Sequence, residues 1–112
     1  MLEHRALWVK DADRAAGILL LSKKHSMICF LAVDPGHRRQ GIASLLLEKA
    51  ITLLGRERDI TVSTFREEDS KGTAPRALYR RFGFTEGALT VEFGYPNQVF
   101  TLPARPADKA EI

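Results

Sequence analysis

A short segment rich in arginine and glycine joins an apolar run to a long leucine-rich run. Residues 33–43 have the sequence VDPGHRRQGIA. We expect the apolar run before this segment to form a buried strand and the leucine-rich run after it to form a helix. The N-terminus of a helix has unpaired backbone N–H groups and a partial positive charge. With Arg38 and Arg39 beside it, this N-terminus is predicted to bind a phosphate or pyrophosphate group.

The same segment does not match two common kinds of phosphate-binding loop. Gly36 and Gly41 have the spacing of a Walker A loop. That loop requires Lys and then Ser or Thr after its second glycine, whereas this chain has Ile42 and Ala43 there. The sequence also contains no G-x-G-x-x-G motif, so it gives no direct support to a dinucleotide-binding fold. We expect His37 to be a surface loop residue.

Length and composition favour one soluble domain. The 112 residues are enough for a modest core, which we assign to residues 1–103. We expect residues 104–112 to form a flexible tail. Hydrophobic residues make up 45% of the chain and charged residues 28%, as is typical of soluble globular proteins. The formal net charge of +3 suits an anionic ligand but is too small to predict a nucleic-acid partner.

The cysteine count and the lengths of the apolar runs exclude several classes of protein. Cys29 is the single cysteine, so an internal disulfide and a cysteine-based metal site are excluded, and we expect no metal. Because Cys29 lies in an apolar run, we expect its thiol to be buried. The longest apolar run, residues 27–33, has the length of a strand rather than of a membrane span. We therefore expect a cytoplasmic protein that does not contact a membrane.

Hydrophobic patterning in the first half predicts three strands and a helix. Strands are expected at residues 6–9, 16–22 and 27–33, and they would form an antiparallel meander. A helix is expected over residues 41–54, with Gly55 as its C-terminal stop. We expect the apolar face of this helix to contain Ile42, Leu45, Leu46, Ala50, Leu53 and Leu54. The adjacent residues Leu45, Leu46 and Leu47 are all assigned to the core.

The second half predicts two further strands around a helix, and then a last strand. Residues 59–65 are rich in β-branched side chains, and residues 84–93 show alternation, so both are expected to be strands. The helix between them is expected to begin near Ser70 or Thr73 and to end at Gly83. A turn at residues 95–97 would lead to a strand at 99–102. Arg76, Arg80 and Arg81 are expected to form a solvated basic face.

The predicted order is therefore β-β-β-α-β-α-β-β. We assign the chain to the α/β class, in an α+β layered arrangement of helices on a mixed sheet. Trp8 would belong either to the core or to a sheet edge.

Two segments resemble motifs of the GNAT N-acetyltransferase superfamily. Residues 38–43, RRQGIA, resemble its Q/R-x-x-G-x-G/A motif, and they follow the V-x-P strand end at residues 33–35. Residues 77–84, ALYRRFGF, resemble its second motif, A-x-x-L-Y-x-x-x-G-F, in slightly altered form. The resemblance extends over residues 6–102 and implies a GNAT-like, mostly antiparallel sheet flanked by helices. Compared with the family pattern, we expect the chain to start at the family's second strand, without the usual first strand and two helices. Gly72 stands where an Asn is common.

The resemblance implies acetyl-CoA as the co-substrate and a primary amine, on a small molecule or a peptide, as the acceptor. It implies a pyrophosphate cradle made by the backbone N–H groups of Arg38, Arg39, Gln40, Gly41, Ile42, Ala43 and Ser44. It also implies that Leu31 and Val33 pair their backbone groups with the pantetheine arm, as an added strand would. Tyr79 matches the family's general acid, which would protonate the CoA thiolate during direct transfer.

Some alternatives stay open at this point. The general base is Glu67, Glu68, His25 or a chain of water molecules. Tyr79 is the catalytic acid or only a core aromatic residue. The short N-terminus and Gly72 motivate a second reading, a non-catalytic acyl-CoA-binding or regulatory module. Because the missing N-terminal elements would leave a sheet edge uncovered, we also expect a homodimer.

Overall fold

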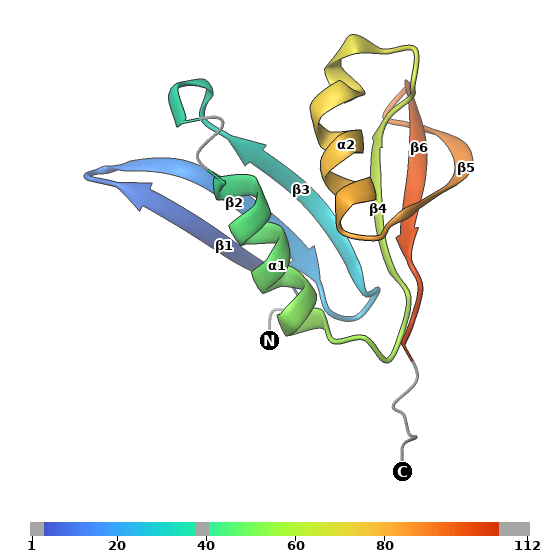
Figure 1. Ribbon diagram of the computed structural model, residues 1–112, viewed down its shortest axis with the longest axis horizontal. Coiled ribbons are helices and arrows are strands. Elements are labelled where there is room, and N and C mark those ends of the chain that lie inside the picture. The colour runs from blue at the N-terminus through green and yellow to red at the C-terminus, as the bar shows by residue number, and fades with distance from the viewer. Residues whose placement is uncertain (1–3, 38–40, 106–112) are drawn as a thin grey trace. The chain divides into compact units, whose positions relative to one another are not determined.

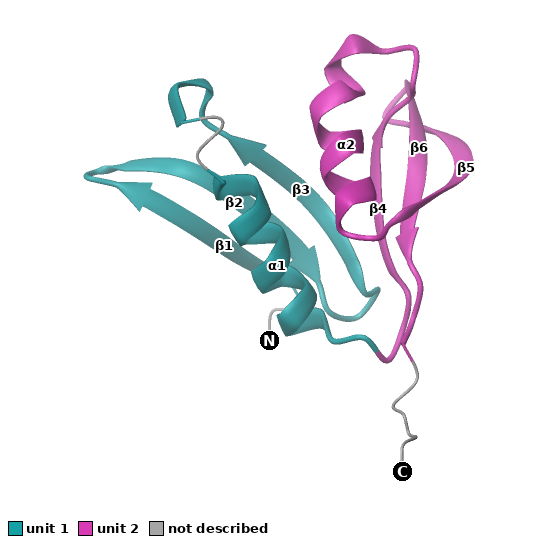
Figure 2. Cartoon of the chain, viewed as in Figure 1, with its two compact units in different colours: residues 1–56 teal, residues 57–112 magenta. Residues whose placement is uncertain are grey.

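The strands and helices follow the predicted order β-β-β-α-β-α-β-β, which is therefore confirmed (Figure 1). The computed structural model describes residues 4–37 and 41–105, and it divides the chain into two units, residues 1–56 and 57–112 (Figure 2). Each unit contains one helix and three strands that pair antiparallel with one another. Within the described residues, no helix is long and apolar enough to span a membrane.

Unit 1 contains a meander of three strands followed by a helix. Its elements are β1 (His4–Asp11), β2 (Arg14–Ser22), β3 (Met27–Val33), a 3-10 turn (Pro35–His37) and α1 (Ile42–Leu54). The central strand β2 pairs antiparallel with β1 on one side and with β3 on the other. The helix α1 lies over one face of this sheet (Figure 1). The buried side chains of this layer include Leu19, Leu21, Ile28, Leu46, Leu47 and Ala50.

A glycine on β2 allows the first turn of α1 to approach the sheet closely. A Cβ atom added at Gly17 would lie 2.6 Å from Cγ2 of Ile42 and 3.1 Å from Cδ1 of Leu46. Gly17 itself is opposite Val33 in the β2–β3 pairing. The absence of a side chain here therefore sets the position of the N-terminal end of α1 relative to the end of β3.

Unit 2 contains a strand, a helix and a terminal hairpin. Its elements are β4 (Ile60–Phe65), a 3-10 turn (Ser70–Gly72), α2 (Thr73–Arg81), β5 (Thr85–Glu92) and β6 (Tyr95–Leu102). Here β6 is the middle strand and pairs antiparallel with both β4 and β5. The buried hydrophobic side chains are Ile60, Val62, Leu78, Tyr79, Phe84, Phe100 and Leu102. On the outer strand β5, Leu89 and Val91 are exposed.

The predicted turn at residues 95–97 is wrong. Glu92 pairs with Tyr95, so the hairpin turns at Phe93 and Gly94 instead. Both turn residues have positive φ, 54° for Phe93 and 77° for Gly94. This is the backbone that a two-residue hairpin requires, because its twist matches that of the two strands. Residues 95–97 therefore belong to β6, and Phe93 is fully exposed at the tip.

Two predictions about the core of unit 1 are also wrong. Cys29 is exposed. The pairing places Leu20 opposite Phe30 and Leu21 opposite Ile28, so Cys29 lies in a β-bulge that interrupts the regular strand. On α1, Leu45 is 48% exposed whereas Leu46 and Leu47 are buried. The buried face of α1 therefore includes Leu46, Leu47 and Ala50, but not Leu45. Trp8, on the outer strand β1, is 61% exposed and so belongs to the sheet edge.

Candidate active site

The N-terminus of α1 has the features of an anion-binding helix end. Gly41 is the N-cap residue, in the left-handed conformation with φ of 77°. The N–H group of Leu45 donates to the carbonyl of Gly41 at 3.0 Å, which is the first bond of the helix. Gly41 has no side chain to cap the helix, and the first turn contains no acidic residue. This end of α1 therefore keeps its partial positive charge, which suits a phosphate group.

The predicted pyrophosphate cradle is only partly within the described residues. Gly41, Ile42, Ala43 and Ser44 form the start of α1 in unit 1. Arg38, Arg39 and Gln40, also assigned to the cradle, lie outside the described residues. The two candidate pantetheine residues, Leu31 and Val33, are half-buried on β3.

Leu31 and Val33 both lie on an outer strand of unit 1. Leu31 is opposite Leu19, and Val33 is opposite Gly17, on the neighbouring strand β2. Unit 1 therefore brings together the described part of the predicted cradle and both residues proposed to pair with pantetheine.

His37 makes contacts that its predicted role as a surface loop residue did not include. Its Nδ1 lies 2.9 Å from Oδ2 of Asp34, and its Nε2 lies 2.8 Å from Oδ2 of Asp11. Hydrogen bonds to Asp11 and then to Asp34 raise the pKa of His37. The pKa of Asp34 is lowered, chiefly by its hydrogen bond with His37. Because Asp11 is distant in sequence, no local pattern pointed to this contact.

Tyr79 lies in the core of unit 2. Its side chain is only 4% exposed. Its ring lies near Phe84 and Phe100, with centroid distances of 5.6 and 5.9 Å. Burial raises the pKa of Tyr79 to about 12, because the charged phenolate is poorly solvated there. Tyr79 is thus a core aromatic residue by its packing, and its phenol keeps its proton throughout the neutral range.

The prediction that Arg76 is solvated is wrong, because only 2% of it is exposed. Its Nη1 donates to the carbonyl of Phe65 at 3.1 Å and to Oε1 of Gln98 at 2.8 Å. Its Nη2 lies 3.0 Å from Oε2 of Glu86, and its guanidinium lies 4.9 Å from the ring centroid of Phe100. Arg76 therefore turns toward the sheet of unit 2, and its charge is compensated there.

Gly72, the position at which the family resemblance leads one to expect Asn, is closely packed. A Cβ atom at Gly72 would lie 3.0 Å from Cβ of Phe65 and 3.1 Å from Cδ of Arg76. The backbone carbonyl of Phe65 would be 3.1 Å away. The side-chain stem of Arg76 therefore occupies the space next to Gly72, and a larger residue there would have to displace it.

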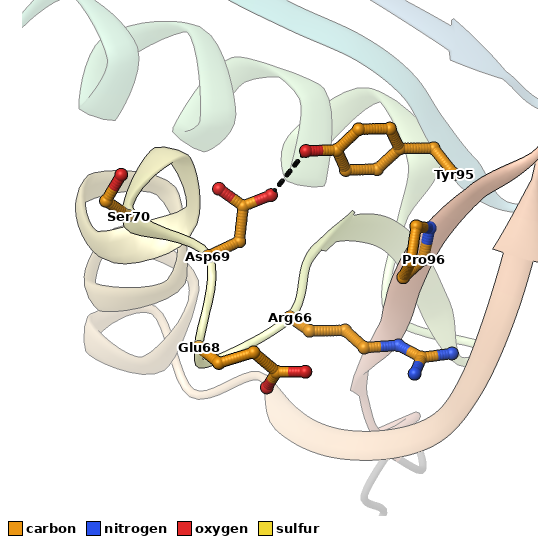
Figure 3. A pocket seen from close by; sticks show the side chains of 6 residues that line it. All are labelled: Arg66, Glu68, Asp69, Ser70, Tyr95 and Pro96. Atoms are coloured by element: carbon orange, nitrogen blue, oxygen red, sulfur yellow. Dashed lines mark hydrogen bonds between the residues drawn. The ribbon is translucent and has the colours of Figure 1, made fainter.

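The candidates for a general base are divided between the two units. Glu67 and Glu68 are exposed and follow β4 in unit 2, whereas His25 is exposed in the turn between β2 and β3 of unit 1. Glu68 lines a surface pocket of about 410 Å³ in unit 2 (Figure 3). The other lining residues are Arg66, Asp69, Ser70, Tyr95 and Pro96. The hydroxyl of Tyr95 donates to Oδ2 of Asp69 at 2.7 Å, and this bond is the main cause of the lowered pKa of Asp69.

The fold is an α/β arrangement, and the N-cap residue of its first helix, Gly41, makes no side-chain cap. Comparison with known sequences names the family. The family model described as "Acetyltransferase (GNAT) domain" matches residues 3–86. The chain therefore belongs to the GNAT acetyltransferase family.

Among curated proteins, the chain is similar to two mycothiol acetyltransferases. The one from Beutenbergia cavernae is 31% identical over 91 residues, which cover 81% of this chain and 27% of the relative. The one from Clavibacter sepedonicus is 33% identical over 90 residues, which cover 78% of this chain and 29% of the relative. The chain thus spans less than a third of the length of these relatives.

Solved structures confirm the predicted GNAT fold. The ribosomal-protein-S18-alanine N-acetyltransferase from Escherichia coli has a TM-score of 0.74 at 20% identity, over 98% of this chain and 76% of that one. A Bacillus subtilis acetyltransferase in complex with CoA has a TM-score of 0.69 at 19% identity, over 92% and 78%. At these identities the likeness concerns the fold, and it supports the mixed α/β arrangement of strands and helices.

Proposed function

We propose that this chain binds acetyl-CoA and transfers its acetyl group to a primary amine of a small molecule or a peptide. The observation that carries the proposal is the N-terminus of α1. There Gly41 leaves the helix uncapped, and the first turn has no carboxylate, in a chain that belongs to an acetyltransferase family. Such a helix end attracts the pyrophosphate of CoA.

In this proposal the co-substrate is held mainly by backbone groups. The N–H groups of residues 38–44 bind the pyrophosphate, and Gly41 lets the backbone approach it closely. Leu31 and Val33 pair their backbone groups with the pantetheine arm, which then behaves as an additional strand beside β3. The half-buried side chains of these two residues serve the packing of unit 1.

The proposed reaction is a direct transfer. The neutral amine nitrogen attacks the carbonyl carbon of the thioester, and a C–N bond forms. The C–S bond then breaks, and the thiolate sulfur takes the phenolic proton of Tyr79. The amine gives up one proton, through a base or water, and Tyr79 regains one from solvent. A backbone N–H group near Val33 stabilises the negative charge that develops on the carbonyl oxygen.

The acceptor is proposed only as a class. The curated relatives are named for mycothiol, and one structural relative is named for the alanine of a ribosomal protein. We therefore propose that the acceptor is an amine-bearing small molecule or peptide. A mycothiol-type acceptor is included among the compounds to be tested. We also keep the cytoplasmic location and the homodimer as proposals.

A second candidate function is a non-catalytic acyl-CoA-binding module. Two observations favour it. Tyr79 is almost fully buried among aromatic side chains, and the position that commonly holds Asn is occupied by Gly72, which packs against Phe65 and Arg76. This module would bind acyl-CoA through α1 in the same way, and it would release no thiol.

A charge placed in the first turn of α1 tests where the pyrophosphate binds. We expect Ala43→Asp to bind CoA at least about tenfold more weakly than Ala43→Asn, a difference of roughly 1.4 kcal/mol. The two side chains have the same size, so the difference isolates the repulsion between a carboxylate and the phosphates. The helix itself should be as stable or more stable with Asp, because a negative charge favours its N-terminus.

The measurement is titration calorimetry with CoA, accompanied by thermal unfolding of both variants. Equal CoA affinity of the Asp and Asn variants would show that the phosphates bind elsewhere. A lower melting temperature of the Asp variant would mean that its weaker binding reflects damage to α1.

A further inference from the structure

We propose that the pocket of unit 2 binds a free amino acid, with its carboxylate at Arg66 and its ammonium group at Glu68. The pocket has a volume of about 410 Å³, and all of its lining residues belong to unit 2 (Figure 3). That volume is in the range of small-molecule sites, about 300–1,000 Å³. The inference goes beyond the proposed function, because neither CoA nor α1 takes part in it.

The guanidinium of Arg66 is oriented by two backbone carbonyls. Its Nε donates to the carbonyl of Asn97 at 3.1 Å, and its Nη2 donates to the carbonyl of Thr90 at 2.9 Å. Thr90 and Asn97 are paired with each other between β5 and β6, so the sheet of unit 2 holds both acceptors in place. These bonds leave the N–H groups of Nη1 for a ligand. They also reduce the conformational entropy that Arg66 loses when a ligand binds.

The charge of Arg66 is not compensated by a carboxylate of the chain. Its two acceptors are neutral carbonyls, and Arg66 forms no ion pair with the described residues. Arg66 is nevertheless half-buried. A partly desolvated guanidinium without a counter-ion favours an anionic group of a ligand. A carboxylate suits it well, because the planar guanidinium matches the geometry of a carboxylate.

Glu68 provides the opposite charge in the same pocket. It is exposed, and it forms no ion pair with Arg66 or with any other residue that the structure describes. Figure 3 shows both side chains among those that line the pocket, with no bond between them. The pocket therefore offers a separate cation and a separate anion to a ligand, instead of a closed salt bridge.

The second carboxylate of the pocket, Asp69, is already used by the chain. Its Oδ2 accepts a bond from the hydroxyl of Tyr95 at 2.7 Å and lies 3.7 Å from Nζ of Lys71. Its Oδ1 accepts a bond from the backbone N–H of Lys71 at 3.0 Å. The ammonium group of a ligand is therefore left to Glu68. The charge of Asp69 also disfavours a phosphate ligand, because the lining then holds two carboxylates and one guanidinium.

A free amino acid combines the groups that this pocket can receive. Its carboxylate and its amino group are attached to one carbon atom, and both are mainly charged at about pH 7. The carboxylate binds at Arg66, and the ammonium group binds at Glu68. Pro96 is an apolar part of the lining, against which an apolar side chain of the amino acid packs. Leucine is therefore a suitable probe.

The experiment is an NMR titration of the isotope-labelled chain at about pH 7, without CoA. The first probe is L-leucine. Two further probes each lack one of its charges: L-leucinamide has no carboxylate, and N-acetyl-L-leucine has no ammonium group. Inorganic phosphate is the fourth probe, and it tests whether Arg66 binds any anion.

L-leucine should bind with a Kd of about 0.1–3 mM and should shift the signals of residues 66–70 and 95–96. L-leucinamide and N-acetyl-L-leucine should each bind at least about tenfold more weakly, because each leaves one charged group of the pocket without a partner. Phosphate should bind more weakly than L-leucine, because two carboxylates repel it.

The variants assign the two charged groups of the ligand. Glu68→Gln should weaken binding of L-leucine by about threefold or more and leave the affinity for N-acetyl-L-leucine unchanged. Arg66→Gln should weaken binding of L-leucine and leave the affinity for L-leucinamide unchanged. The matched control is Glu57→Gln, which makes the same change of charge at an exposed residue of unit 2 outside the pocket. It should bind L-leucine as the unmodified chain does.

Three results would overturn the proposal. They are no binding of L-leucine up to about 10 mM, equal affinity for L-leucine and its two derivatives, and stronger binding of phosphate than of L-leucine. Equal affinity of Glu68→Gln and Glu57→Gln for L-leucine would contradict the role of Glu68.

Thermal unfolding shows whether each variant is folded. If Arg66→Gln does not fold, the comparison of L-leucine with L-leucinamide on the unmodified chain still tests the carboxylate site. These binding results are independent of acetyl transfer, which is measured by thiol release, so the two proposals can fail separately.

Discussion

Tyr79→Phe should lower kcat by about 10²–10⁴-fold and leave CoA affinity nearly unchanged. In the proposed reaction the phenol donates a proton to the leaving thiolate, and phenylalanine cannot do so. The aromatic ring itself stays, so the packing against Phe84 and Phe100 should be kept. Acetyl-CoA turnover and CoA affinity, measured separately, check both parts of this prediction.

Tyr95→Phe is the matched control, since Tyr95 is the other of the two tyrosines in the chain. It is partly exposed in unit 2, and its hydroxyl donates to Asp69. We expect its kcat to stay close to that of the unmodified chain. Equal kcat in Tyr79→Phe and the unmodified chain would leave Tyr79 as a core aromatic residue. Joint loss of turnover and CoA affinity would contradict the role of general acid.

The raised pKa of Tyr79 adds a pH dependence to the same prediction. Burial raises this pKa to about 12, so the phenol keeps its proton well beyond neutral pH. The pH profile of kcat should therefore show no descending limb from Tyr79 below about pH 10. The raised pKa also affects folding stability, because burial favours the neutral form of the phenol over the charged one. Its contribution is present below the ordinary pKa of tyrosine, about 10, and is lost as the pH rises toward 12.

Arg76→Ala should lower the free energy of unfolding by about 2–4 kcal/mol. The substitution removes the donor to two acceptors, the carbonyl of Phe65 and the side chain of Gln98. It also removes the packing of the guanidinium over Phe100 and leaves a cavity in the core of unit 2. The remaining partner, Glu86, is partly exposed and also pairs with Arg80, which limits the cost of the broken ion pair.

Arg80→Ala is the control for this second prediction. Arg80 pairs with the same carboxylate of Glu86, but its side chain is 47% exposed. An exposed pair of this kind contributes about 0–1 kcal/mol. Urea denaturation of the two variants measures the difference. Equal destabilisation by Arg76→Ala and Arg80→Ala would mean that burial and the bonds to Phe65 and Gln98 add little.

The order of the elements was predictable because it depends on local patterns. The alternation in strands and the helical spacing of apolar residues are properties of short windows. Gly41 and Gly55 were placed as helix ends from the same local signals, and the structure has them as the caps of α1. The GNAT fold followed from two motifs, each of which is also short.

The features that escaped prediction depend on residues far apart in sequence. Arg76 looked like part of a solvated face, because its partners Phe65, Gln98 and Glu86 come from three other segments. The contact of His37 with Asp11 was not predicted, because Asp11 ends β1 and lies 26 residues earlier in the sequence.

Two other predictions were wrong because of the backbone conformation. The bulge at Cys29 depends on how β3 pairs with β2, and strand pairing cannot be predicted from one strand alone. The hairpin turn was missed because a non-glycine residue such as Phe93 seldom adopts positive φ. For the site, α1 begins after Gly41 as expected. The binding or catalytic roles of all the predicted site residues stay predictions.

The central claim is that this chain transfers an acetyl group from acetyl-CoA to an amine, and an acceptor-dependent thiol-release assay tests it most directly. The panel contains polyamines, amino acids, aminoglycosides, peptide N-termini and a mycothiol-type acceptor. Acetylation of the last is followed by mass spectrometry, because this acceptor carries a thiol of its own. We predict thiol release above the rate without acceptor for at least one class, with one acetylated amine formed for each thiol. Saturable acetyl-CoA binding with no acceptor-dependent thiol release across the panel would contradict catalysis and favour the non-catalytic acyl-CoA-binding module.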